Sequence, residues 1–169
     1  MEFFKIVLLC ILAAVSYGMI HDQITARICI EYFTVAHPPV FNTQSPTLLG
    51  LGWGIIATWW VGLFLGLPLA FAARSGQRTK LTSRQLVRPI SWLLLAMALL
   101  AFTAGSAGYI LAARGTVRIP DFLVDAIPRE HHVRFMADWW AHSASYLVGF
   151  VGGVVLIICS WRRRKAQSG

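Results

Sequence analysis

Four long apolar stretches determine which folds are open to this chain. They cover about residues 4–20, 48–73, 90–113 and 137–161. A helix needs about 20 apolar residues to cross the hydrocarbon core, so the last three qualify easily and the first is marginal. With 57% hydrophobic and only 13% charged residues, the chain is more apolar than an ordinary soluble domain. The sequence therefore predicts an all-α membrane protein, a single domain (1–169) built as a four-transmembrane-helix bundle.

The first stretch has a second interpretation, a cleaved signal peptide. Its charged start is weak because Glu2 offsets Lys5, and cleavage would leave the following histidine-bearing segment at a free N-terminus. We favour an uncleaved span. Small residues recur at helical spacing in the other three stretches, which favours close helix packing in one bundle, with a homodimer face as the alternative.

Lys and Arg orient the predicted bundle. They are dense in the loop 74–89 and in the tail 162–169, whereas in the loops 21–47 and 114–136 they are interleaved with acids. The positive-inside rule places both termini and the loop 74–89 in the cytoplasm, and the other two loops on the extracytoplasmic side. The basic residues line membrane ends without interleaved aromatic residues, so the lipid bilayer is the expected partner and nucleic acid is not.

Histidines and carboxylates concentrate on the other side of the membrane. All five histidines and every carboxylate except Glu2 lie in or beside the two outer loops. Imidazole and carboxylate groups bind transition metals and transfer protons near neutral pH. The sequence thus predicts a polar site at the extracytoplasmic face.

The first outer loop contains an alternating stretch, residues 24–35, rich in β-branched and aromatic residues. Alternation of this kind favours a short extended, β-like segment with one apolar face. A helical continuation of the first span competes with it, because Ile24, Ile28 and Glu31 also fall at helical spacing.

On the helix expected to lead into the fourth span, His131, Asp138 and His142 fall within about 40° of one another. Two interpretations stay open. In one, Asp138 accepts hydrogen bonds from His142 and Arg134 and closes the top of the bundle. In the other, Asp138 and His142, four residues apart, supply half of a metal site, as paired ligands on adjacent helical turns do in zinc proteins. Ionisable groups at membrane depth are costly, which favours a functional role.

The second interpretation gives a definite ligand set. His21-Asp22 closes the first span, at the membrane level where the fourth begins, and mixed nitrogen and oxygen ligands suit a divalent metal, zinc or iron foremost. The predicted catalytic groups are Glu130 or His131, one of them the general base that activates a metal-bound water. The predicted metal ligands are His21, Glu31, His37, Asp138 and His142. A serine triad around Ser143 and a b-type haem held by His21 and His142 are weaker alternatives.

The run HDQITARICIEYFTVAHPPVF, followed by SPTLLGLGWGIIATWWVGL, resembles a family of bacterial four-span inner-membrane proteins with no assigned activity. The resemblance covers the first half of the chain well and the second half loosely. It implies a bacterial inner-membrane location and supplies no reaction.

Two functions are therefore predicted. The first is a multi-pass membrane protein whose extracytoplasmic His/carboxylate site binds a divalent metal and acts as a membrane-embedded, metal-dependent hydrolase. The alternative is a non-enzymatic tetraspan whose outer segment docks another membrane protein.

Overall fold

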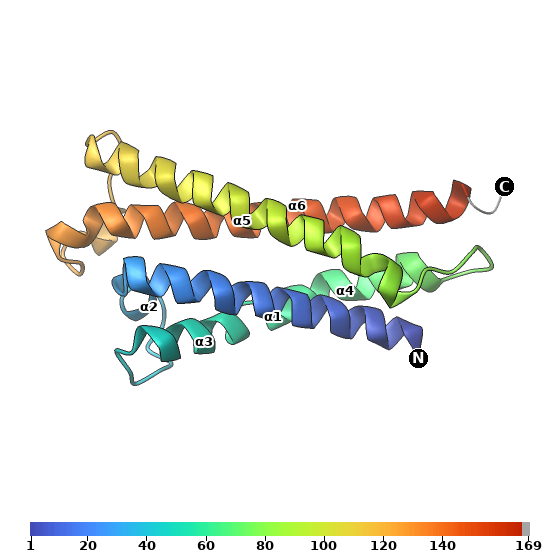
Figure 1. Cartoon of the computed structure of the whole chain (residues 1–169). Helices are drawn as coiled ribbons and strands as arrows, with labels where there is room; N and C mark the ends of the chain where they lie inside the picture. Colours follow the sequence, from blue (N-terminus) through green and yellow to red (C-terminus); the bar gives the residue numbers. More distant parts are fainter. Residues whose placement is uncertain (167–169) are drawn as a thin grey trace.

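The computed structural model of the chain describes residues 1–166 and is helical throughout, with no strand among those residues. The last three residues of the predicted cytoplasmic tail lie outside the described range. In Figure 1 the helices run side by side along one long axis, and the two ends of the chain lie at the same end of the bundle.

The four predicted spans are confirmed as four helices long and apolar enough to cross a membrane. The second is interrupted and forms two helices in sequence. A short helix, α2, follows the first span, and two single 3-10 turns precede the last. The long elements are α1 (Glu2–Ile28), α3 (Pro46–Ile56), α4 (Trp59–Arg74), α5 (Ser83–Ala113) and α6 (His132–Ala166); the short ones are α2 (Glu31–Thr34), η1 (Asp121–Leu123) and η2 (Arg129–His131).

The break between α3 and α4 lies where this span crosses α1. The Thr58 hydroxyl donates to the carbonyl oxygen of Gly54, one turn back, and such side-chain bonds to the helix ladder are a known cause of kinks. A Cβ atom added to Gly18 of α1 would come within 2.6 Å of that same Gly54 oxygen. Only residues without a side chain allow this approach, so the glycines bring α1 and α3 into backbone contact.

The second close contact joins α5 to α6. A Cβ atom on Gly108 would come within 2.7 Å of the Met136 carbonyl oxygen, and one on Gly105 within 3.1 Å of that of Ala137. Lipid-embedded helices associate through such small residues because bilayer tails provide no hydrophobic drive. These predicted small-residue contacts are thus made within the bundle.

The extended segment predicted over residues 24–35 is wrong. The helix α1 continues to Ile28, two turns past the predicted end of the first span, and α2 follows after a short turn at Cys29 and Ile30. Thr25 and Ala26 are buried on the inner face of this helix, whereas Ile24 and Ile28 lie exposed on the outer one. Tertiary packing outweighs intrinsic strand preference here, as it often does.

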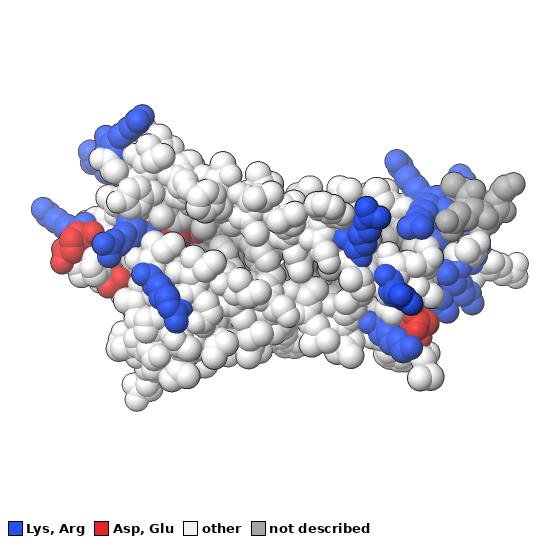
Figure 2. Space-filling view, in the orientation of Figure 1, with Lys and Arg blue, Asp and Glu red and all other residues white. Residues whose placement is uncertain are grey.

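Charge separates the two ends of the molecule from its middle. Figure 2 shows an uncharged girdle, with basic groups gathered at the end where the chain begins and ends and with mixed acidic and basic groups at the other. At the basic end the fully buried Arg164 donates from its guanidinium to the carbonyl oxygens of Ala72 (2.6 Å), Ser75 (2.7 Å) and Thr79 (2.7 Å). It thereby satisfies carbonyl groups at and beyond the end of α4.

Candidate metal centre

Two helices far apart in sequence meet at the acidic end of the bundle and bring three ligand-type side chains together. His21 and Asp22 lie in the last two turns of α1, and His142 lies three turns into α6. One ligand atom from each lies within 4.8 Å of the other two. Tetrahedral zinc with bonds of about 2.0–2.2 Å holds its donors about 3.3–3.6 Å apart, so the three side chains would move closer together around an ion.

The ring of His142 is oriented from both sides. Its Nδ1 lies 2.9 Å from the backbone carbonyl oxygen of Asp138, and because a carbonyl accepts, this nitrogen carries the proton. Its Nε2 lies 3.2 Å from Asp22 Oδ1. Both side chains are buried, with 7% and 8% of their surface exposed. A metal-binding histidine is held in the same way, one nitrogen donating to a backbone carbonyl and the other free for the ion.

His21 completes the set with a nitrogen that has no partner. Its Nε2 is buried and makes no hydrogen bond. The ring lies edge-on to His142, with centroids 4.5 Å apart, and stacks on Tyr17 at 5.6 Å. Two histidines that bind one haem iron lie on opposite faces of the porphyrin plane, and these two rings, edge-on at 4.5 Å, leave no space for that plane, so the b-type haem alternative does not fit.

Aromatic side chains cover the cluster on the side of the outer segment. Tyr32 stacks on His142 with centroids 4.2 Å apart, and Phe33 meets the same ring edge-on at 5.8 Å. Tyr32 and Phe33 belong to α2, so this short helix is the cap that separates the cluster from water. An ion held there would act in a low-dielectric setting, where each electrostatic contact is stronger than in water.

Asp138 lies beside the cluster with its carboxyl group unsatisfied. The residue is fully buried, and neither side-chain oxygen has a hydrogen-bond partner. A donor near it, the amide N–H of Cys29, already donates to the carbonyl of Thr25 at 3.0 Å. The interpretation in which His142 and Arg134 donate to this carboxylate is therefore wrong. An unpaired charge at this depth costs several kcal/mol, so the group needs a proton, a cation or a ligand.

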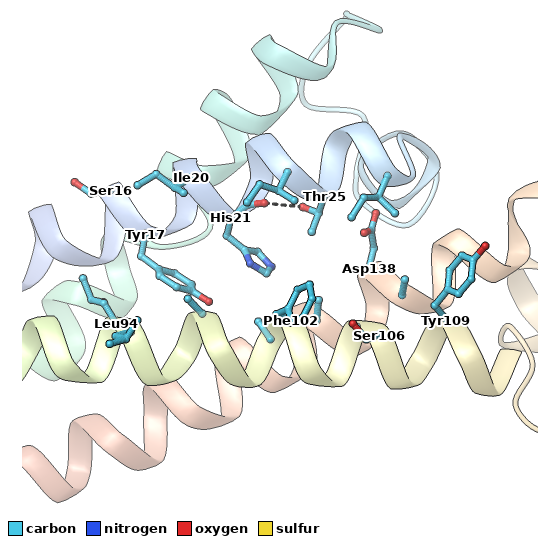
Figure 3. A pocket seen from close by; sticks show the side chains of 18 of the residues that line it. Ser16, Tyr17, Ile20, His21, Thr25, Leu94, Phe102, Ser106, Tyr109 and Asp138 are labelled. Atoms are coloured by element: carbon cyan, nitrogen blue, oxygen red, sulfur yellow. Dashed lines mark hydrogen bonds between the residues drawn. The ribbon is translucent and has the colours of Figure 1, made fainter. Parts of the chain in front are cut away.

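A groove of about 720 Å³ opens beside these residues, between α1, α5 and α6. Figure 3 shows His21 and Tyr17 reaching into it from α1, with Phe102, Ser106 and Tyr109 on α5 opposite and Asp138 reaching in from α6. The groove and the cluster therefore share His21, and Asp138 stands at the boundary of both.

Two of the predicted site residues form a separate pair. Glu31 Oε1 lies 2.7 Å from His131 Nδ1, and the Cys29 thiol donates to Glu31 Oε2 at 3.2 Å. Burial on its own would raise the pKa of Glu31, but hydrogen bonds from its own backbone amide, Cys29 and His131 outweigh it and hold the pKa below 4.5. Burial also raises the pKa of Cys29 to about 12, so this thiol is a neutral donor.

The remaining predicted residues supply no ligand atom to the cluster. His131 is eleven residues from His142, roughly 16 Å along the helix axis, and the exposed Glu130 lies beside it. His37 Nδ1 donates to the carbonyl oxygen of Tyr32 at 2.7 Å, and its ring faces Trp53 at 4.6 Å. The structure thus unites His21 and His142 with Asp22, and it does not bring Glu31, His37, Glu130 or His131 to them.

No family model, curated protein or solved structure matches the chain. The fold and the site define its class: a multi-pass membrane protein, by the length and apolar character of its four spans, with a buried His/Asp/His group able to hold a metal ion.

Proposed function

We propose that this protein binds a divalent metal ion through His21, Asp22 and His142, close to one face of the membrane. The observation that carries the proposal is the convergence of three ligand atoms within 4.8 Å in a region where ionisable groups are costly. Two nitrogens and one oxygen suit zinc or iron better than metals that prefer thiolates.

Three protein ligands leave an ion with an open position, the arrangement of catalytic rather than structural zinc sites. In the hydrolytic function predicted from sequence, the water at that position needs a general base. The carboxyl group beside the cluster is that of Asp138, so we propose Asp138 for this role. Its buried, unpartnered oxygens support the assignment.

The extracytoplasmic position of the site, the bacterial inner-membrane location and the family resemblance belong to the same proposal. The charge distribution supports the orientation, because the cluster lies at the end opposite to the dense Arg and Lys. The alternative, a tetraspan that docks a partner or a second copy through its outer segment, has less support. The aromatic side chains of α2 face inward onto His142, and Phe33 is buried.

The test is the metal content of detergent-purified protein after incubation with zinc or iron(II) and removal of the excess. The wild type should retain about one ion per chain. Asp22→Asn and His142→Ala should each lower the affinity at least tenfold, by about the 10–100-fold or more that altered metal sites lose. His132→Ala is the matched control, because the His132 ring bonds to the Ile127 carbonyl outside the cluster and should leave the metal in place.

Each result bears directly on the proposal. A folded wild-type protein that holds neither ion ends it, and the cluster is then a buried hydrogen-bonded pair with a neighbouring histidine. Equal metal content in the His132 and His142 variants would also contradict it, because the ions would then be bound elsewhere on the surface.

A further inference from the structure

The groove beside the cluster opens toward the lipid. Its lining includes large apolar side chains with high exposure, Ile20 (65%), Ile24 (59%) and Phe102 (77%), on helices apolar enough to cross a membrane. Helices α1 and α5 form its two walls. A molecule that fills it would therefore enter sideways from the bilayer rather than from water.

The lining of the groove includes two ionisable residues. They are His21 and Asp138, and the Nε2 of the first and both carboxyl oxygens of the second are buried and have no hydrogen-bond partner. Buried polar groups in native structures are nearly always satisfied. Two unpaired groups among the lining residues of one groove indicate that a ligand completes them.

The charge of the lining restricts the head group of that ligand. No Lys or Arg occurs among the described residues that line the groove. A phosphate-bearing head group would face Asp138 there with no cation to balance it, at a high electrostatic cost. The charge of the lining therefore argues against an anionic lipid.

The volume of the groove and its side chains further restrict the class of ligand. A volume of about 720 Å³ suits one head with part of a single chain, within the usual range for small-molecule sites. Tyr17, Phe102 and Tyr109 line the groove and offer aromatic surface for a flat ring. Imidazole and carboxyl groups can donate to a ring carbonyl or accept from a ring hydroxyl.

We propose that this groove binds a quinone or quinol with an apolar chain, its ring oxygens at His21 and Asp138 and its chain along the channel between α1 and α5. The groove shares both His21 and Asp138 with the proposed metal site, so a ring oxygen and an ion would compete for His21 Nε2; the ring needs no ion to bind. The proposal concerns binding and includes no electron transfer.

The experiment uses full-length protein in detergent, delipidated and treated with chelator, so that it is independent of metal. Decylubiquinone is added, and the retained ligand is measured by native mass spectrometry. Wild-type protein should hold one quinone per chain. Dioleoylglycerol, which is neutral but has two chains, and dioleoylphosphatidylglycerol, which is anionic, should compete at least tenfold less well.

Four variants connect binding to the groove. Ala98→Phe fills the channel from an exposed lining position, and Leu99→Phe adds the same ring one residue away, outside the lining. We expect at least a tenfold loss of affinity for the first and none for the second. Asp138→Leu removes the polar group and should also lose at least tenfold, whereas Asp138→Asn, which keeps donor and acceptor atoms, should lose less.

Folded wild-type protein that retains no decylubiquinone overturns the proposal, as does equal loss in the Ala98 and Leu99 variants. Equal or tighter retention of dioleoylglycerol would assign the groove to a two-chain lipid and overturn the ring assignment. Metal content measured on a separate, untreated sample keeps this outcome distinct from the fate of the metal proposal.

Discussion

Asp22 and His142, 120 residues apart in the chain, meet across the bundle with 3.2 Å between Asp22 Oδ1 and His142 Nε2. The pair ties α1 to α6 together with the hydrogen bond between the Tyr17 and Ser145 hydroxyl groups at 2.8 Å. Because His142 Nδ1 is already committed to the Asp138 carbonyl, the strength of the pair depends on what occupies the space between Nε2 and the carboxylate. With a proton on Nε2, His142 and Asp22 form an ion pair. With a metal ion between them, both side chains are ligands of that ion.

The pair makes a first prediction, on stability without metal. Removal of one partner leaves the other buried and unpaired, so Asp22→Leu and His142→Leu should each lower the free energy of unfolding by about 3 kcal/mol. The double variant should recover most of this loss, because two leucines of similar volume need no partners. Thermal melting of chelator-treated protein in detergent measures the coupling. Losses that simply add would mean that the two side chains do not interact in the folded protein.

Asp138 makes a second prediction that separates function from folding. Its carboxyl group contributes no hydrogen bond to the fold, so Asp138→Leu should leave the melting temperature unchanged or raise it. Residues kept for function at a cost in stability behave in this way. A fall of more than about 2 kcal/mol in the free energy of unfolding would show instead that the carboxyl group has a structural partner.

The sequence was sufficient for the fold and for part of the site. The four spans follow from apolar length alone, because a bilayer admits few alternatives. His142 was found from its helical spacing to Asp138, although the bond joins His142 to the backbone of Asp138 and not to its side chain. Glu31 and His37 were grouped with it because all lie at one membrane face. Location at the same membrane face does not determine which side chains come into contact, because neighbouring helix ends are about 10 Å apart.

Asp22 shows what sequence reasoning missed and why. The ligand set predicted from the sequence contains His21 but not the adjacent Asp22, although the pair closes the first span. The continuation of α1 to Ile28 decides the matter, because it makes residues 21 and 22 part of the packed helix rather than the start of a loop. The helical spacing of Ile24, Ile28 and Glu31, if preferred over the alternation, predicts that the first helix continues past residues 21 and 22. The groove left no signal in sequence, because three helices form it.

Acidification provides a third prediction. Burial lowers the pKa of His37 below its ordinary 6.5, only partly offset by its bond to the Tyr32 carbonyl. The unfolded chain thus takes up this proton first, and stability falls as the pH drops below 6.5. The pKa of Glu31 is held below 4.5, so its contribution is present above that value and is lost on further acidification. His37→Gln should flatten the melting temperature between about pH 6.5 and 5 relative to wild type. His132→Gln is its control, and equal slopes in both variants would contradict the assignment.

Membrane orientation gives a fourth prediction. The Arg-rich loop between α4 and α5 should face the cytoplasm, with the cluster on the opposite side. Alkaline phosphatase, which needs an oxidising compartment to form its disulfides, should be inactive when fused at Gly76 and active when fused at Pro120. Both positions lie in loops between helices. The reverse pattern of activity would place the cluster on the cytoplasmic side and invert the proposed location of the site.

The fifth prediction concerns Arg164, which holds the end of the bundle opposite to the cluster. The fully buried guanidinium donates four hydrogen bonds to carbonyl groups of the α4 end and the loop that follows, including that of Arg78 at 3.2 Å. Arg164→Ala leaves those acceptors without donors and should lower the free energy of unfolding by about 2 kcal/mol or more. Arg164→Lys should recover only part of the lost stability, because an ammonium group cannot span acceptors placed for a planar guanidinium.

Arg163→Ala, at an exposed neighbouring position, is the control: it removes the same charge and should leave the melting temperature unchanged. If the two alanine variants melt together, the buried hydrogen bonds contribute nothing beyond net charge. Metal and quinone binding should persist in Arg164→Ala below its melting temperature, because the cluster and the groove lie at the far end of α6.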